Sequence, residues 1–120
     1  MNSALGLAAG RVAIGGVALA APELGAKLFR LDPVGNPHLP YMIRMFGSRE
    51  VVLGAATLLA RGKTRRNLIL AGIAVDAADT AAAVLAGEAR QVERPTQVIL
   101  AGVAGIAVLN GLAGLRQPRA

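Results

Sequence analysis

Six ionisable side chains of this sequence lie inside long apolar stretches, where charge is costly. Three are arginines and three are carboxylates: Arg11, Arg44, Arg49, Glu50, Asp76 and Asp79. Ionisable groups in membrane-length apolar segments usually face one another or a cavity, and they mark functional sites. Because the six formal charges sum to zero, we predict a paired network. An unpaired charge at such a depth would cost several kcal/mol.

A buried network of this kind suits several functions. The main expectation is a binding or accessory role, in which the network shapes a pocket for a lipophilic molecule such as a quinone, a sterol or a lipid, or docks a partner subunit. The first alternative is a membrane-embedded isomerase or hydrolase, with Glu50, Asp76 and Asp79 as candidate acids and bases. The second is proton-coupled transport, which needs an oligomer when each chain has so few helices. The third is a structural network that only holds the helices together.

The candidate ligand-binding set adds two neutral polar residues to the charges. It comprises Arg11, Arg44, Arg49, Glu50, Asp76, Asp79, Thr80 and Asn110. The chain has no cysteine, and its one histidine lies in a loop rich in proline and glycine. A metal site would therefore need carboxylates alone, and we predict none. We predict no cofactor either, except that the pocket would admit a quinone.

The elements that must position these side chains are membrane helices. Of the 120 residues 54% are hydrophobic, which leaves too little polar surface for an ordinary soluble domain. Apolar runs of about 20 residues match the hydrocarbon core of a bilayer, roughly 30 Å thick. We predict an all-α fold in one membrane domain, with four transmembrane helices at 4–21, 41–60, 67–87 and 95–115 and an interfacial helix at 23–31. A soluble four-helix bundle is the alternative, but it would expose these apolar runs to water.

Helical geometry predicts which charges meet. At about 1.5 Å per residue, Arg49 and Asp79 lie at a similar depth on neighbouring antiparallel helices. Glu50 lies near mid-membrane, within reach of Arg11 from the first helix. Because Arg49 and Glu50 are about 100° apart on their helix, we expect them not to face each other. Arg44 lies near the end of its helix, from which it can reach the interface.

The third predicted helix has one polar, narrow face. Asp76, Asp79 and Thr80 share it because they are spaced by three and four residues. Gly72 and Ala83 lie on the same face and allow another helix to approach closely. We expect this face to point into the bundle and not toward lipid.

Small residues in the first predicted helix suggest further close contacts. Gly6 and Gly10 are spaced by four residues, and so are Gly16 and Ala20. This spacing lets a second helix backbone approach closely, and similar residues occur in the last helix. Both helices therefore leave room for a homo-oligomer or a membrane partner subunit.

Basic residues predict the orientation in the bilayer. The loop at 61–66 is the most basic part of the chain, so the positive-inside rule assigns it and both termini to the cytoplasm. That side carries six basic residues, namely Arg61, Lys63, Arg65, Arg66, Arg116 and Arg119, and the other side four, namely Lys27, Arg30, Arg90 and Arg94. The net charge of +6 is spread over the chain instead of forming one stripe, so we predict no nucleic-acid partner.

Three runs of the chain carry a family resemblance. The runs are LAAPELGAKLFRLDP, IRMFGSREVVLGAATL and AGIAVDAADTAAAVLAG, and together they cover most of residues 10–87. They resemble small four-helix bacterial membrane proteins of the DoxX-like kind, in positions Arg44, Phe46, Gly47, Arg49, Glu50, Asp76 and Asp79. The resemblance implies a multi-pass protein of the bacterial inner membrane. Relatives are linked to quinone-dependent sulfur oxidation, to membrane oxidoreductase assemblies and to lipophilic-ligand binding, but a chain without cysteine is a poor candidate for direct thiol chemistry.

Overall fold

The computed structural model describes residues 3–116, and within them the chain forms five helices and no strand. The helices are α1 (Ser3–Ala20), α2 (Pro22–Leu28), α3 (Leu39–Leu59), α4 (Gly62–Glu88) and α5 (Arg94–Arg116). The predicted all-α class is thus confirmed for the described residues. By length and composition α1, α4 and α5 are long and apolar enough to cross a membrane, which indicates a membrane-embedded protein.

Helix α3 matches the predicted span at 41–60 and differs from the other three long helices. Its 21 residues are enough to cross a bilayer. However, it holds Arg44, Arg49 and Glu50, and these charges keep it out of the apolar set. A fourth transmembrane helix therefore stays a prediction.

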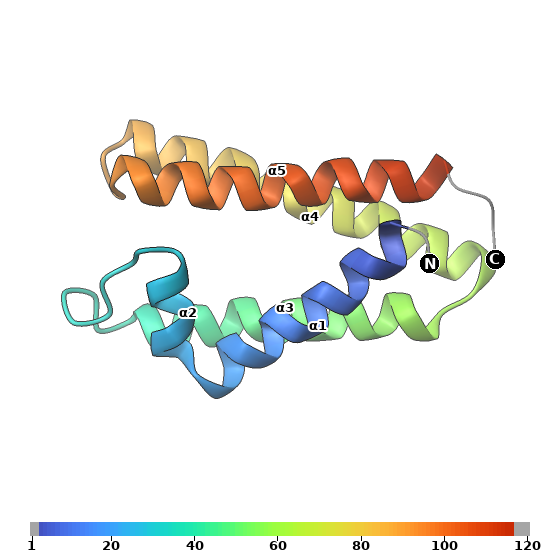
Figure 1. Cartoon of the computed structure of the whole chain (residues 1–120), viewed down its shortest axis with the longest axis horizontal. Coiled ribbons are helices and arrows are strands. Elements are labelled where there is room, and N and C mark those ends of the chain that lie inside the picture. Colours follow the sequence, from blue (N-terminus) through green and yellow to red (C-terminus); the bar gives the residue numbers. More distant parts are fainter. Residues whose placement is uncertain (1–2, 117–120) are drawn as a thin grey trace.

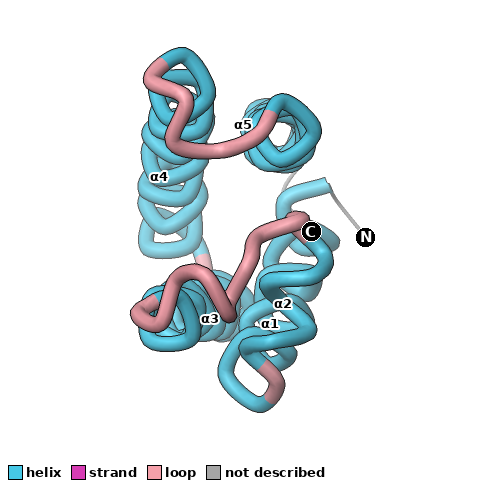
Figure 2. The backbone as a smooth tube through the Cα atoms, turned by 90° about the vertical axis from the view of Figure 1, so that its left-hand side faces the viewer, coloured by secondary structure: helices cyan, strands magenta, loops and turns pink. Residues whose placement is uncertain are grey.

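The four long helices form two antiparallel pairs. Helix α1 packs mainly on α3, and α4 packs mainly on α5, as Figure 1 shows with α4 and α5 above α1 and α3. The end-on view of Figure 2 places one long helix at each corner, with α2 beside α1. We call the end that carries α2 and the α4–α5 turn the α2 end, and the opposite end the termini end.

The contact between α1 and α3 is a seam of small residues with a seven-residue repeat. In α1 the buried residues are Ala4, Ala8, Arg11, Gly15 and Ala18. In α3 they are Ile43, Gly47, Glu50, Gly54 and Thr57. Both series alternate spacings of four and three, the pattern of left-handed helix packing. A Cβ atom added to Gly15 would lie 2.6 Å from the carbonyl oxygen of Gly47, so the helices approach this closely only because both residues are glycine.

The predicted close approach of another helix does not occur at Gly10 or Gly16 within this bundle, and contacts of these residues with a second copy or a partner subunit stay a prediction. A Cβ atom added to Gly10 or to Gly16 would meet nothing within 4 Å. The seam uses Ala8 and Gly15 instead, because these residues follow the seven-residue repeat that keeps one stripe of α1 against α3.

The basic segment at 61–66, expected to be a loop, belongs mostly to α4, which begins at Gly62. Lysine and arginine favour helix, so they extend α4 by a turn. Arg65 also donates from Nε to the carbonyl oxygen of Thr57 at 3.1 Å and from Nη2 to that of Leu58 at 3.0 Å. These bonds satisfy carbonyl groups that the end of α3 leaves free.

Helix α2 ends at Leu28, earlier than the predicted residue 31. Arg30 adopts φ 57°, in the left-handed region. The amide of Leu31 then donates back to the carbonyl oxygen of Ala26 at 2.8 Å, which closes the helix. Ala26 is fully buried and packs with Ala18 and Ile43, so α2 is fixed to the α1–α3 pair.

Candidate functional site

Arg11 lies at the centre of the buried charges and joins three helices. Its Nη1 donates to Glu50 Oε2 of α3 at 2.8 Å and to Asp76 Oδ1 of α4 at 3.1 Å. Its Nη2 donates to Asp76 Oδ2 and, at 3.4 Å, to the carbonyl oxygen of Gly72. The three charged residues are at most 6% exposed. The expected reach of Arg11 to Glu50 is confirmed, and the bond to Asp76 adds α4 to the same centre.

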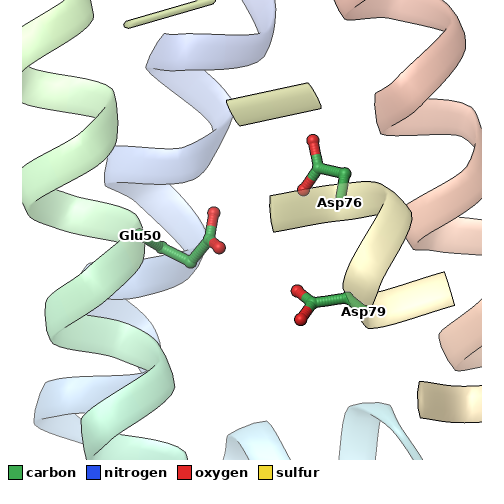
Figure 3. A group of neighbouring side chains, drawn as sticks. All are labelled: Glu50, Asp76 and Asp79. Carbon is green, nitrogen blue, oxygen red and sulfur yellow. The ribbon is translucent and has the colours of Figure 1, made fainter. Parts of the chain in front are cut away.

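Gly72 makes room for the guanidinium of Arg11. A Cβ atom at position 72 would lie 3.1 Å from Arg11 Nη2. The predicted inward face of the third long helix is confirmed, because Gly72, Asp76 and Ala83 are the buried residues of α4. Figure 3 shows Asp76 and Asp79 of α4 pointing toward Glu50 of α3.

Arg49 continues the network toward the α2 end. Its Nη2 donates to Asp79 Oδ2 at 2.7 Å and to Glu50 Oε1 at 3.1 Å, and its Nη1 lies 3.4 Å from Asp79 Oδ1. The predicted pairing of Arg49 with Asp79 is confirmed. The expectation that Arg49 and Glu50 do not face each other is wrong, because both side chains are long enough to converge from positions about 100° apart.

The guanidinium of Arg49 also lies against an aromatic pair. Its Cζ is 5.3 Å from the centre of the Phe46 ring, a distance that allows a cation–π interaction. Phe46 in turn meets Phe29 edge to face, with ring centres 6.3 Å apart. Phe29 follows α2, so the α2 end of the network is bounded by rings from two elements.

The five connected residues form a chain of alternating charge. Its order is Asp76, Arg11, Glu50, Arg49, Asp79. It contains three carboxylates and two guanidiniums, so its formal charge is −1 and not the predicted zero. The side chains of Asp76, Arg11 and Glu50 are almost covered, at 5–7% exposed, whereas those of Arg49 and Asp79 are 40% and 33% exposed.

Arg44 explains the difference in charge, since it lies outside the network. It is exposed, beside the buried Ile43 of the seam, and its Nε lies 3.4 Å from the carbonyl oxygen of Leu19 near the end of α1. Thr80 also makes a local bond, from its Oγ1 to the carbonyl oxygen of Asp76 at 2.8 Å. The structure thus brings neither of these two predicted ligand-binding residues to the charged chain.

A cavity of about 770 Å³ lies between the two helix pairs. All five members of the charged chain line it, and we call them the charged wall. Asn110 of α5, another predicted site residue, lines the cavity as well, and so do Phe29 and Phe46. Apolar and small residues of α1, α4 and α5 form most of the remaining surface, among them Gly6, Leu7, Gly10, Ile14, Ala82, Ala86, Leu100, Val103 and Ile106.

The three carboxylates lie close enough together to resemble a metal site. One oxygen from each of Glu50, Asp76 and Asp79 lies within 4.8 Å of the others. Each carboxylate already accepts hydrogen bonds from Arg11 or Arg49, and a metal ion would have to displace these donors. The arrangement therefore suits ion pairing better than metal ligation.

Two features of the site were missed from the sequence. The sequence places Arg11 within reach of Glu50 on α3, whereas in the structure Arg11 is the residue that joins Glu50 to Asp76. The burial of Arg11 could have been predicted from the sequence, because Ala4, Arg11 and Ala18 recur every seven residues and therefore share one face of α1. No pattern in the sequence predicted the cavity, because its size depends on the distance between the two helix pairs.

Comparison of the chain with protein-family models, with curated proteins and with solved structures found no match. The resemblance to DoxX-like proteins accordingly stays a prediction that the quoted residues carry.

Proposed function

We propose that this chain is a small multi-pass membrane protein that binds a lipophilic molecule between its two helix pairs. The observation that carries the proposal is the cavity of about 770 Å³, in which one charged wall meets a mainly apolar lining. Sites for small ligands have volumes of about 300–1,000 Å³ and combine apolar walls with a few placed polar groups.

The accessible polar groups indicate what the ligand presents to the charged wall. Arg11, Glu50 and Asp76 are covered and bonded to one another, so a ligand reaches mainly Arg49 and Asp79. Among the described residues nothing accepts a hydrogen bond from Arg49 Nε or bonds to the side-chain amide of Asn110. A polar end that both donates and accepts, such as a hydroxyl, an amide or a quinone–quinol pair, matches these groups.

The same proposal includes the placement in the membrane. Helix α3 serves as the fourth span, and it is tolerated there because Glu50 is 4% exposed and faces the bundle. The basic start of α4 and both termini lie in the cytoplasm, and α2 lies at the opposite interface. By its resemblance to DoxX-like proteins the chain belongs in a bacterial inner membrane, either alone, as a homo-oligomer or beside a partner subunit.

A membrane-embedded isomerase or hydrolase is the second candidate. It is favoured by the cavity, which reaches Glu50, Asp76 and Asp79 at once. Both oxygens of all three carboxylates accept hydrogen bonds from arginines. Asp79 is the most accessible acid or base because its side chain is 33% exposed. Binding ranks first because it needs no free carboxylate, and a turnover assay on the extracted ligand separates the two.

A matched pair of glycine variants tests the binding function. Both Gly10 and Gly16 lie on α1 where a Cβ atom meets nothing within 4 Å, but only Gly10 lines the cavity. Gly10→Leu should fill cavity space and remove a stoichiometric lipophile that is detected by native mass spectrometry and identified after organic extraction. Gly16→Leu should retain it.

The two variants also exclude unfolding as the cause, since both replace an open helical glycine by a better helix former. Equal occupancy in Gly10→Leu and Gly16→Leu would place the ligand outside the cavity. A wild-type protein that carries no lipophile after gentle extraction, and binds none on addition, would contradict the proposed function.

A further inference from the structure

Helix α5 contacts the opposite helix pair or its flanking segment near each end of the bundle. At the termini end, Gly114 of α5 packs directly on Ala4 of α1. At the α2 end, the buried Thr96 of α5 donates to the carbonyl oxygen of Arg30 at 2.9 Å. Between these points α1 runs away from α5, as Figure 1 shows. Residues of both helices line the cavity in this region, and we call the part of the cavity between α1 and α5 the lateral slot.

The slot has apolar, open edges. On α1 its edge is Gly10, which is exposed, lines the cavity and has no atom near a built Cβ. On α5 its edge is formed by Val103 and Ile106, which line the cavity and are 47% and 61% exposed. Arg49 of α3 and Ala82 of α4 are exposed cavity-lining residues as well, but the Arg49–Asp79 ion pair bridges those two helices. We therefore infer that the cavity opens between α1 and α5.

The position of the slot determines what it faces. Both α1 and α5 are long and apolar enough to cross a membrane, and Gly10, Val103 and Ile106 lie in their middle parts. An opening there faces lipid acyl chains and not water. The charged wall lies on α1, α3 and α4, away from the α5 edge.

We propose that the ligand is a single-chain amphiphile drawn from the bilayer. Its polar end lies against Arg49 and Asp79, and its chain leaves the cavity between α1 and α5 into the surrounding lipid. This inference rests on the proposed binding function and adds the class of ligand and its route. An open slot places no limit on chain length, whereas a closed cavity excludes chains longer than its own length. From Leu100 to Asn110 that length is about 15 Å at 1.5 Å per residue.

The test compares two 1-alkanols, one with a chain well below this length and one well above it. Binding to the full chain in phosphatidylcholine nanodiscs is measured by native mass spectrometry at equal mole fractions in the bilayer. Wild-type protein should bind both within about threefold of each other, since a chain between the helices and a chain among lipids are in similarly apolar surroundings.

A tryptophan at the slot is the decisive variant. Ile106→Trp narrows the slot, and Val98→Trp is its control, because Val98 lies on the same helix, is equally exposed at 61% and does not line the cavity. Ile106→Trp should weaken binding of the long alkanol at least tenfold and change the short one less than threefold. Val98→Trp should change neither.

The outcomes separate the slot from the binding function. The proposed slot is contradicted if wild-type protein binds only the short alkanol, or if Ile106→Trp weakens the binding of both alkanols equally. Either result would still be consistent with the proposed binding function. If wild-type protein binds neither alkanol nor any extracted lipophile, the binding function fails and the slot fails with it.

Discussion

Removal of Arg11 should destabilise the fold far more than removal of Arg49. The Arg11 side chain is 7% exposed and bonds to Glu50 and Asp76, which are equally covered. Arg11→Met would leave the covered Asp76 without a counter-charge and Glu50 with only the half-exposed Arg49 as its partner. Breaking a buried ion pair costs about 3–5 kcal/mol. Arg49 is 40% exposed, so solvent or ligand screens its pairs, and Arg49→Met should cost about 1 kcal/mol.

The chain offers a clean assay for this difference. It has no cysteine and no tryptophan, so an engineered cysteine reports unfolding without background. Thr57→Cys is suitable, because Thr57 is 5% exposed, belongs to the α1–α3 seam and lies outside the cavity of about 770 Å³. The rate of thiol modification in detergent, relative to the unfolded chain, gives the free energy of unfolding for each variant.

Two results would refute this reasoning. Equal losses for Arg11→Met and Arg49→Met would mean that Arg11 is not the centre of the network. The triple variant Arg11→Met, Glu50→Gln, Asp76→Asn should regain most of the lost stability, because no covered charge is left unpaired. If it regained none, packing of the Arg11 stem, and not charge, would explain the loss.

Two further predictions use the same assay. Gly15→Ala should destabilise by about 1–3 kcal/mol, because the new Cβ would lie 2.6 Å from the carbonyl oxygen of Gly47, whereas its neighbour Gly16→Ala should stabilise by up to about 1 kcal/mol. Arg90 has φ 58° just beyond α4, so Arg90→Gly should relieve backbone strain and stabilise by about 0.5–1 kcal/mol, and a loss of stability would show that its side chain outweighs the strain.

Local patterns were enough to predict the helices and the polar face of α4. The apolar runs, bounded by Pro22 and by the segment at 89–93, predicted long helices close to those observed. The spacing of Gly72, Asp76 and Ala83 predicted the buried face, because residues three, four and seven apart share one side of a helix. The position of each residue along its helix was enough to predict the pair Arg49–Asp79, because two antiparallel helices joined by a short turn keep a fixed register.

Only the tertiary structure decided which arginines belong to the charged network and which lie outside it. Arg11 and Arg44 are both arginines with apolar or small residues on either side, and nothing in their immediate neighbours ranks one above the other. Arg11 entered the network because it follows the seven-residue repeat of the α1–α3 seam, and Arg44 stayed outside because it lies beside that repeat. The formal charge of −1 on the network could therefore not be predicted without knowing which residues form the α1–α3 seam.

By itself, therefore, the sequence determined an all-α, membrane-embedded chain with charges facing inward, since helix formation and burial depend on periodicity within each segment. The cavity and its lateral slot were decided only by the tertiary structure. They exist because α1 meets α5 at Ala4 and Gly114 and then diverges from it. The distance between two helices depends on contacts from both partners, and no single segment encodes it.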